Sequence, residues 1–207
     1  MNTTKKSLAT ATIAATALAG LGVLNAPTAS AEAAATKTFS KTFQQTCQQV
    51  GPLTDQELQA TVSGVQPVGV KRGAAFKLTN VKIKVVVPAN INSVLATTGV
   101  RSATVTFSVV NLKNTNLAPA TKDAIATNVT TKRIQVVAGQ TSSFVVPKVG
   151  GLTVGLKGGT KVGPGTMRSG NVAATFQGYD ANGNKLGPAN VVRCAAENVV
   201  LGTVRVS

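Results

Sequence analysis

Few side chains in this sequence could carry out covalent chemistry. The 207 residues contain no histidine, so neither a Ser-His-Asp triad nor a Cys-His pair can be assembled from them. Asp55 and Glu57 lie two residues apart, and two carboxylates on one strand face could act as a glycosidase pair. Such a pair is more often a solvated turn. We therefore predict no catalytic residue and no enzyme, and we keep a secreted hydrolase of an unrecognised type as an alternative.

Two further motifs resemble ligand-binding loops without completing them. Residues 180–184 follow the D-x-N-x-N start of a calcium loop, but Lys185 stands where glycine belongs and Val191 where glutamate belongs. The glycine-rich run 158–165 lacks the G-K-[ST] sequence of a phosphate loop. Within residues 180–184, the Asn182-Gly183 pair is a strong hairpin signal. The sequence thus predicts a turn there, and no metal or cofactor.

The first 31 residues have the features of an export signal. Lys5 and Lys6 precede a mostly apolar run over residues 8–24, and Ala29-Ser30-Ala31 forms an A-x-A cleavage site. We predict a signal peptide over residues 1–31 and a mature domain over residues 32–207. The mature protein would be secreted or associated with the cell envelope, without a transmembrane segment. An uncleaved membrane anchor is the weaker alternative, because the apolar run is rich in Ala, Thr and Gly.

The two cysteines, Cys47 and Cys194, lie near the two ends of the mature domain. In an exported protein two cysteines most simply form one disulfide, and no histidine is present to complete a metal site with them. On the chain-entropy model, closing so long a loop stabilises the fold by roughly 5 kcal/mol.

The charge is strongly positive, at +15 for the whole chain. Without the two lysines of the signal, 19 basic residues stand against 6 acidic ones, or +13. This balance attracts anionic polymers, and salt weakens the attraction. Anionic cell-wall polymers and lipid headgroups are the expected partners, whereas seven aromatic residues offer little stacking surface for nucleic acid. The competing interpretation is that the charge serves solubility alone.

The strongest structural pattern, in residues 74–88, places several of these charges on one strand. Phe76 and Leu78 alternate with polar residues, and after Asn80 the apolar positions continue one residue out of step. Such a slip is typical of a β-bulge, here at residues 79–80. With this bulge, Lys77, Lys82 and Lys84 would all point outward on one face of the strand. Lys132 and Arg133, from a later segment, could join them. The candidate anion-binding face is therefore Lys77, Lys82, Lys84, Lys132 and Arg133.

The rest of the mature chain also reads as short alternating strands. The expected strands cover residues 36–50, 58–62, 101–110, 132–138, 142–147, 171–179, 185–194 and 198–206. In the first of them the spacing of Phe39, Phe43 and Cys47 also suits a helix. A short helix or loop is expected over 91–98, a surface excursion over 111–129, and short extended pieces between turns over 150–170. This spacing favours one all-β domain, an antiparallel sandwich or barrel. A membrane pore subunit is a weaker alternative, because outward positions carry Thr and Lys.

The layout of these elements resembles a known family. A strand bearing Cys47 opens the domain, a short strand follows, and a connection with Pro67 leads to the long strand that ends at Pro88. A glycine-rich late half then precedes Cys194 and the terminal strand. This order is similar to that of the secreted immunoglobulin-like domains of unknown function in actinobacteria. The resemblance implies an immunoglobulin-like β-sandwich closed by one disulfide, in a non-catalytic binding or structural module of the cell envelope.

Overall fold

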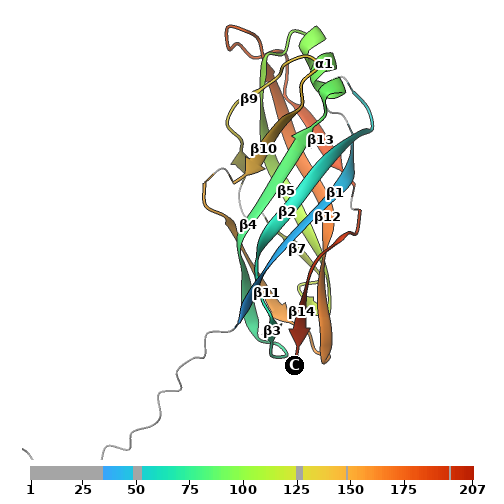
Figure 1. The fold of residues 1–207 in the computed structure, drawn as a ribbon, viewed down its shortest axis with the longest axis vertical. Coiled ribbons are helices and arrows are strands. Elements are labelled where there is room, and N and C mark those ends of the chain that lie inside the picture. Colours follow the sequence, from blue (N-terminus) through green and yellow to red (C-terminus); the bar gives the residue numbers. More distant parts are fainter. Residues whose placement is uncertain (1–34, 49–52, 125–127, 148, 196) are drawn as a thin grey trace, which may run out of the picture. The chain divides into compact units, whose positions relative to one another are not determined.

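The computed structural model describes residues 35–48, 53–124, 128–147, 149–195 and 197–207. In these ranges the chain is mostly β: fourteen strands belong to one hydrogen-bonded sheet, and the only helix is α1 (Ala89–Thr97) (Figure 1). The predicted all-β class is therefore confirmed.

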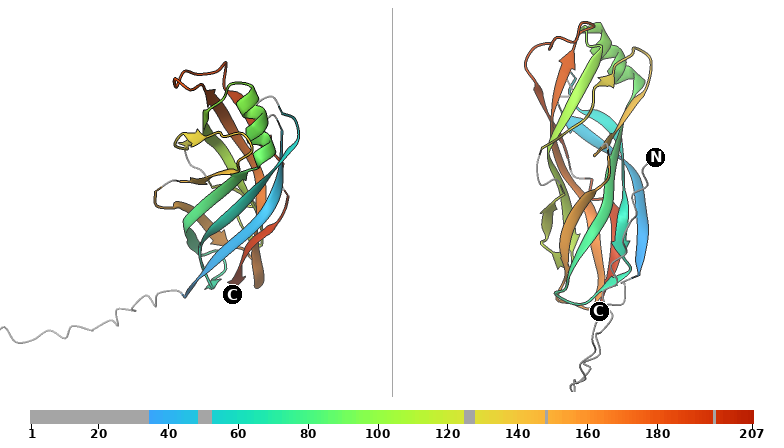
Figure 2. Two further views of the ribbon diagram at one scale, coloured as in Figure 1. Left: turned by 45° about the horizontal axis from the view of Figure 1, so that its top comes forward. Right: turned by 90° about the vertical axis from the view of Figure 1, so that its left-hand side faces the viewer.

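The strands fall into two groups that face each other across the core (Figures 1 and 2). The first group holds β1 (Thr36–Gln48), β2 (Gln56–Pro67), β4 (Ala75–Val87), β10 (Ser142–Val146) and β11 (Leu152–Gly158). The second holds β5 (Ser102–Thr115), β12 (Gly163–Tyr179), β13 (Asn190–Cys194) and β14 (Val200–Val206). The remaining strands are β3 (Gly69–Val70), β6 (Leu117–Ala118), β7 (Thr121–Asp123), β8 (Val129–Thr130) and β9 (Ile134–Gln135). One main core cluster contains buried side chains from both groups.

The sheet is mixed, which corrects the prediction of a purely antiparallel one. Its hydrogen-bonded path runs β3-β14-β12-β13-β1-β2-β4-β11-β6, with β5 on β12 and β10 on β4. All the pairs are antiparallel except that of β14 with β3, in which Arg205 lies opposite Gly69 and Val206 opposite Val70. The exception arises because β3 continues in the direction of β2, which is also the direction of β14.

The predicted bulge in β4 is confirmed. Along β2, Ser63 pairs with Lys82 and Val65 pairs with Thr79, so β4 carries one extra residue between the two pairs. Asn80 lies in the bulge and has a φ of +52°, a left-handed conformation that Asn tolerates better than most residues. As a result the aliphatic side chains on both sides of the bulge reach the core.

The predicted disulfide between Cys47 and Cys194 is also confirmed, with an S–S distance of 2.05 Å. The two residues lie directly opposite each other in the β1–β13 pair. The bridge therefore lies within the sheet, between adjacent strands, where the two groups of strands meet.

The expectation of a surface excursion over residues 111–129 was wrong for most of its length. Strand β5 continues to Thr115 with Leu112 buried, and Leu117 and Ala124 are buried as well. Asn116 makes the bend after β5, with a φ of +52° and a side chain bonded to the backbone N–H and C=O of Lys161. Residues 125–127 lie outside the described part.

Two other expectations need correction. The segment 132–138 holds only the two-residue β9, which pairs with β5, whereas 142–147 holds β10, which pairs with β4. The glycine-rich stretch 150–170 is not a series of short pieces, because it contains β11 and the start of the 17-residue β12.

For residues 91–98 the expectation was a short helix or a loop. The segment is helical, within α1, and Gly99 ends the helix with a φ of +86°.

Candidate functional site

The three lysines of β4 lie on the outer face of the sheet. Lys77, Lys82 and Lys84 are all exposed, and the outward residues opposite Lys82 and Lys84 on β2 are Ser63 and Thr61. The β4 lysines thus form a cationic row on a hydroxyl-bearing surface, as the bulge predicts. We call this row the β4 lysine face.

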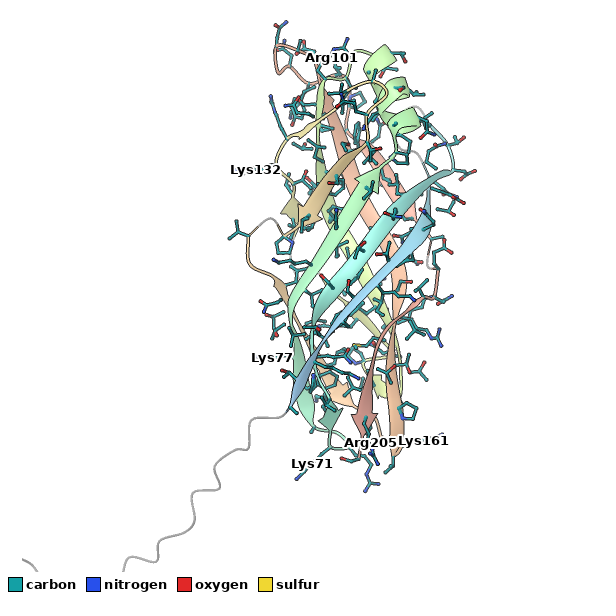
Figure 3. The ribbon with its side chains drawn as sticks, viewed as in Figure 1. Lys71, Lys77, Arg101, Lys132, Lys161 and Arg205 are labelled. Carbon is teal, nitrogen blue, oxygen red and sulfur yellow. A yellow bond between two sulfur atoms is a disulfide. The ribbon has the colours of Figure 1, made fainter. Side chains whose placement is uncertain are left out.

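The other two residues of the predicted face do not lie on this strand. Lys132 and Arg133 lie in the connection between β8 and β9. The Arg133 guanidinium lies over the Tyr179 ring, 4.1 Å from its centroid, and donates a hydrogen bond of 3.2 Å to the Gly183 carbonyl. Arg133 is therefore engaged with the 180–184 turn. Figure 3 shows Lys132 in the upper half of the view, which is the half that contains α1, and Lys77 in the lower half, toward the opposite end of the strands.

That opposite end carries a group of cations that the sequence analysis did not single out (Figure 3). It is formed by the β3–β4 turn, the end of β11, the β11–β12 turn and the end of β14. All its basic side chains are exposed. We call it the basic end, and its members are Lys71, Arg72, Lys157, Lys161 and Arg205.

Backbone hydrogen bonds hold these segments together. The Arg72 N–H donates to the Ser207 carbonyl over 2.9 Å, and the Gly73 N–H donates to the Gly158 carbonyl over 3.1 Å. Arg205 lies opposite Pro164 in the β12–β14 pair. The positions of the cations are therefore fixed by strand register, although their side chains extend into solvent.

The electrostatics of the basic end are one-sided. The acidic residues that the structure describes are Asp55, Glu57, Asp123, Asp180 and Glu197, and none of them belongs to the segments that form this end. No ion pair to its five cations is found within the described ranges. Cations gathered with no acidic side chain among them produce a positive potential that concentrates anions near the surface.

The basic end cannot be recognised from the sequence, because its members are spread over residues 71 to 205. Only the Lys71-Arg72 pair is a local signal. The remaining three become neighbours of that pair through the parallel β3–β14 contact and the β4–β11 pairing, which alternating patterns alone do not reveal.

The acidic residues do not form a shared site. Asp55 and Glu57 are both exposed near the start of β2. The Asp180 carboxylate accepts hydrogen bonds from the backbone N–H groups of Asn182 and Asn184, over 2.9 and 2.8 Å, and from the Asn184 amide over 3.1 Å. The Asn184 backbone N–H foremost, and then its side chain, lower the pKa of Asp180. Among the residues described, no three His, Cys, Asp or Glu side chains are grouped closely enough to hold a metal ion.

The fold and its cations define a disulfide-linked, mostly β protein whose basic end carries no acidic side chain. Comparison with family models, with curated proteins and with solved structures found no match. In the parts of the chain that the structure describes, no helix is long and apolar enough to cross a membrane. The disulfide suggests an extracytoplasmic location.

Proposed function

We propose that this protein is an exported, non-catalytic binding or structural module of the cell envelope. It associates with anionic wall polymers or anionic lipid headgroups through the basic end, and the β4 lysine face extends that surface along the strand. The attraction is electrostatic and spread over several charges, so it selects the charge of the polymer more than its chemical detail.

The observation that carries this proposal is the one-sidedness of the basic end. Five exposed cations come from four segments, and no acidic side chain of the described chain shares those segments. A surface that served only solubility would be expected to mix both signs. Lys77 lies on β4 beyond Ala75, which pairs with Lys157, so the β4 lysine face begins close to the basic end.

The same proposal assigns the chain to the immunoglobulin-like class of sandwiches found in secreted actinobacterial proteins. Two features support the assignment: strands that face each other across the main core cluster, and a single disulfide between an early and a late strand. Two features depart from it: the parallel β3–β14 pair, and a bridge that joins adjacent strands.

The proposal is tested by sedimentation with purified cell walls across a salt series. We expect the oxidised mature protein to sediment with the walls at low salt and to be released as salt rises, because screening weakens contacts between exposed charges. Walls stripped of their anionic polymers serve as the control and should retain much less protein. Equal retention on both kinds of wall, or retention that ignores salt, contradicts the proposal.

Export is tested separately by mass spectrometry of the protein recovered from the wall and the medium. We expect a mature chain that begins at Glu32 and is 2 Da lighter than the reduced form. Recovery of only the full-length chain from the cytoplasm would contradict export, whatever the outcome with purified walls.

A further inference from the structure

The interior contains a cavity beneath α1, at the junction of the two core clusters. Its volume is about 90 Å³. Space is left there because three alanines, Ala60 on β2, Ala103 on β5 and Ala174 on β12, point inward among larger aliphatic and aromatic side chains. This volume is several times what one water molecule needs, and smaller than the roughly 150 Å³ cavity that holds benzene in an engineered protein. The cavity therefore suits a short apolar group.

The cavity adjoins a surface groove at the seam between β9 and β10. Four residues line both spaces: Asn92, Ile134, Ser142 and Phe144. In the described chain no backbone ladder joins the two strands, since β9 pairs with β5 and β10 pairs with β4. The seam is thus closed by side chains alone.

Hydrogen bonds order the polar side chains at this junction. Asn92, of which 1% is exposed, donates to the Gln140 carbonyl over 2.7 Å and to the Ser142 hydroxyl over 3.0 Å. These bonds tie α1 to the start of β10, which places a fixed polar rim at the mouth of an apolar space. Sites of this kind use a few placed polar groups to orient a mostly apolar ligand.

The groove outside the seam is cationic. Lys132 and Arg133 line it and no acidic residue does. Since the Arg133 guanidinium is engaged with Tyr179 and Gly183, Lys132 is the cation left to meet an incoming anion.

We propose that this seam binds a short-chain carboxylic acid, with the apolar tail in the cavity beneath α1 and the carboxylate beside Lys132. The charge at the groove selects the anionic head, and the cavity volume limits the length of the tail. The inference does not depend on the basic end, which lies toward the opposite end of the strands.

The test follows the alanine methyl groups by NMR while butanoate, hexanoate or decanoate is added to the oxidised protein, with 1-hexanol as the uncharged probe. We expect the methyl signals of Ala60, Ala103 and Ala174 to shift, an affinity that rises from butanoate to hexanoate, and no further gain with decanoate. Hexanoate should bind more tightly than 1-hexanol, and Lys132→Gln should remove that difference.

Filling the cavity provides the decisive variant. Ala174→Leu should lower hexanoate affinity at least about tenfold, because the new side chain occupies the tail site. The matched control is Ala173→Leu, on the same strand but outside the lining of the cavity, and it should leave the affinity unchanged. Thermal unfolding verifies that each variant folds, and Ala60→Val replaces Ala174→Leu if the latter does not.

Three results would overturn the inference. Absence of methyl shifts with every probe would show that the cavity takes no ligand of this class. Shifts that persist in the filled variant would place the binding elsewhere. Equal binding of hexanoate and 1-hexanol, unaffected by Lys132→Gln, would refute the anionic head.

Discussion

At the scale of single residues, Asp180 organises the tip of the β12–β13 connection. Its carboxylate accepts three hydrogen bonds from Asn182 and Asn184, and these bonds favour the ionised form. The residue is partly exposed and its three bonds all stay within residues 180–184, so the effect is local to the turn. The motif that resembles the start of a calcium loop is thereby explained as a self-bonded turn.

This arrangement predicts the acid titration of the turn. Because the pKa of Asp180 in the folded protein lies below its ordinary value of 3.8, its contribution to turn stability is complete above that value. The contribution is lost only as pH falls through the lower, folded pKa. Amide shifts of Asn182 and Asn184, followed by NMR, should have a midpoint below that of a linear peptide spanning residues 178–186. A midpoint equal to or above that of the peptide would contradict this explanation.

A second residue-scale prediction concerns Gly151. A Cβ atom at this position, just before β11, would fall on the backbone of Asn80, inside the β4 bulge, whereas a Cβ at Gly155 within β11 would meet no atom within 4 Å. Gly151→Ala should therefore lower the free energy of unfolding by about 1–3 kcal/mol. Gly155→Ala should change it by no more than about 0.5 kcal/mol. Denaturant unfolding of both variants measures the difference, and equal values would show that the bulge does not approach Gly151 as described.

At the scale of elements, the disulfide fixes β1 to β13. The ladder between these strands is short, with Cys47 opposite Cys194 and Gln48 opposite Arg193. The pairing of β1 with β2 is far longer. The covalent bond thus reinforces the pair in which few backbone hydrogen bonds join the two groups of strands.

Removal of the bridge should be costly. The two cysteines are 147 residues apart, and removing a disulfide that closes a long loop typically costs about 2–5 kcal/mol. We expect the Cys47→Ala, Cys194→Ala double variant to show this loss in denaturant unfolding, with strand content by circular dichroism unchanged at low denaturant. A loss below about 1 kcal/mol would mean that packing alone holds β1 against β13.

Elements that depend on a pattern within one segment could be predicted from the sequence. Elements that depend on contacts with residues far away in the sequence could not. The one-residue shift of the apolar positions after Asn80 predicts the β4 bulge, because one extra residue exchanges the two faces of a strand. In contrast, the glycines of β12 suggested turns. Gly165 is needed because a Cβ there would collide with Leu117, which belongs to another element. The burial of Leu117 itself depends on a bend whose Asn116 side chain bonds to Lys161.

The candidate site follows the same rule. The exposure of Lys77, Lys82 and Lys84 follows from alternation within one strand and was predicted. The basic end depends on which strands become neighbours, and the β3–β14 contact is only two residue pairs long. Such a contact leaves no periodic signal in the sequence.

At the scale of the whole molecule, the charge is unevenly distributed over the surface. The acidic residues within the described ranges lie at the start of β2, on β7, in the 180–184 turn and after β13, away from the segments of the basic end. A protein charged in this way is expected to meet an anionic surface with one end first, because the field orients it during approach. We therefore expect the basic end to determine both the affinity of the protein for an anionic surface and its orientation there.

The central claim is tested most directly by comparing two charge variants of equal net charge in sedimentation with purified cell walls. One variant carries Lys71→Gln, Arg72→Gln and Lys161→Gln in the basic end. The control carries Lys41→Gln, Lys185→Gln and Arg193→Gln, three exposed cations outside it. At about 1 kcal/mol for each cation close to an anionic surface, the basic-end variant should lose roughly a hundredfold in affinity, while the control stays near the unmodified protein. Equal losses in the two variants would contradict the account, because the net charge and not the basic end would then determine binding.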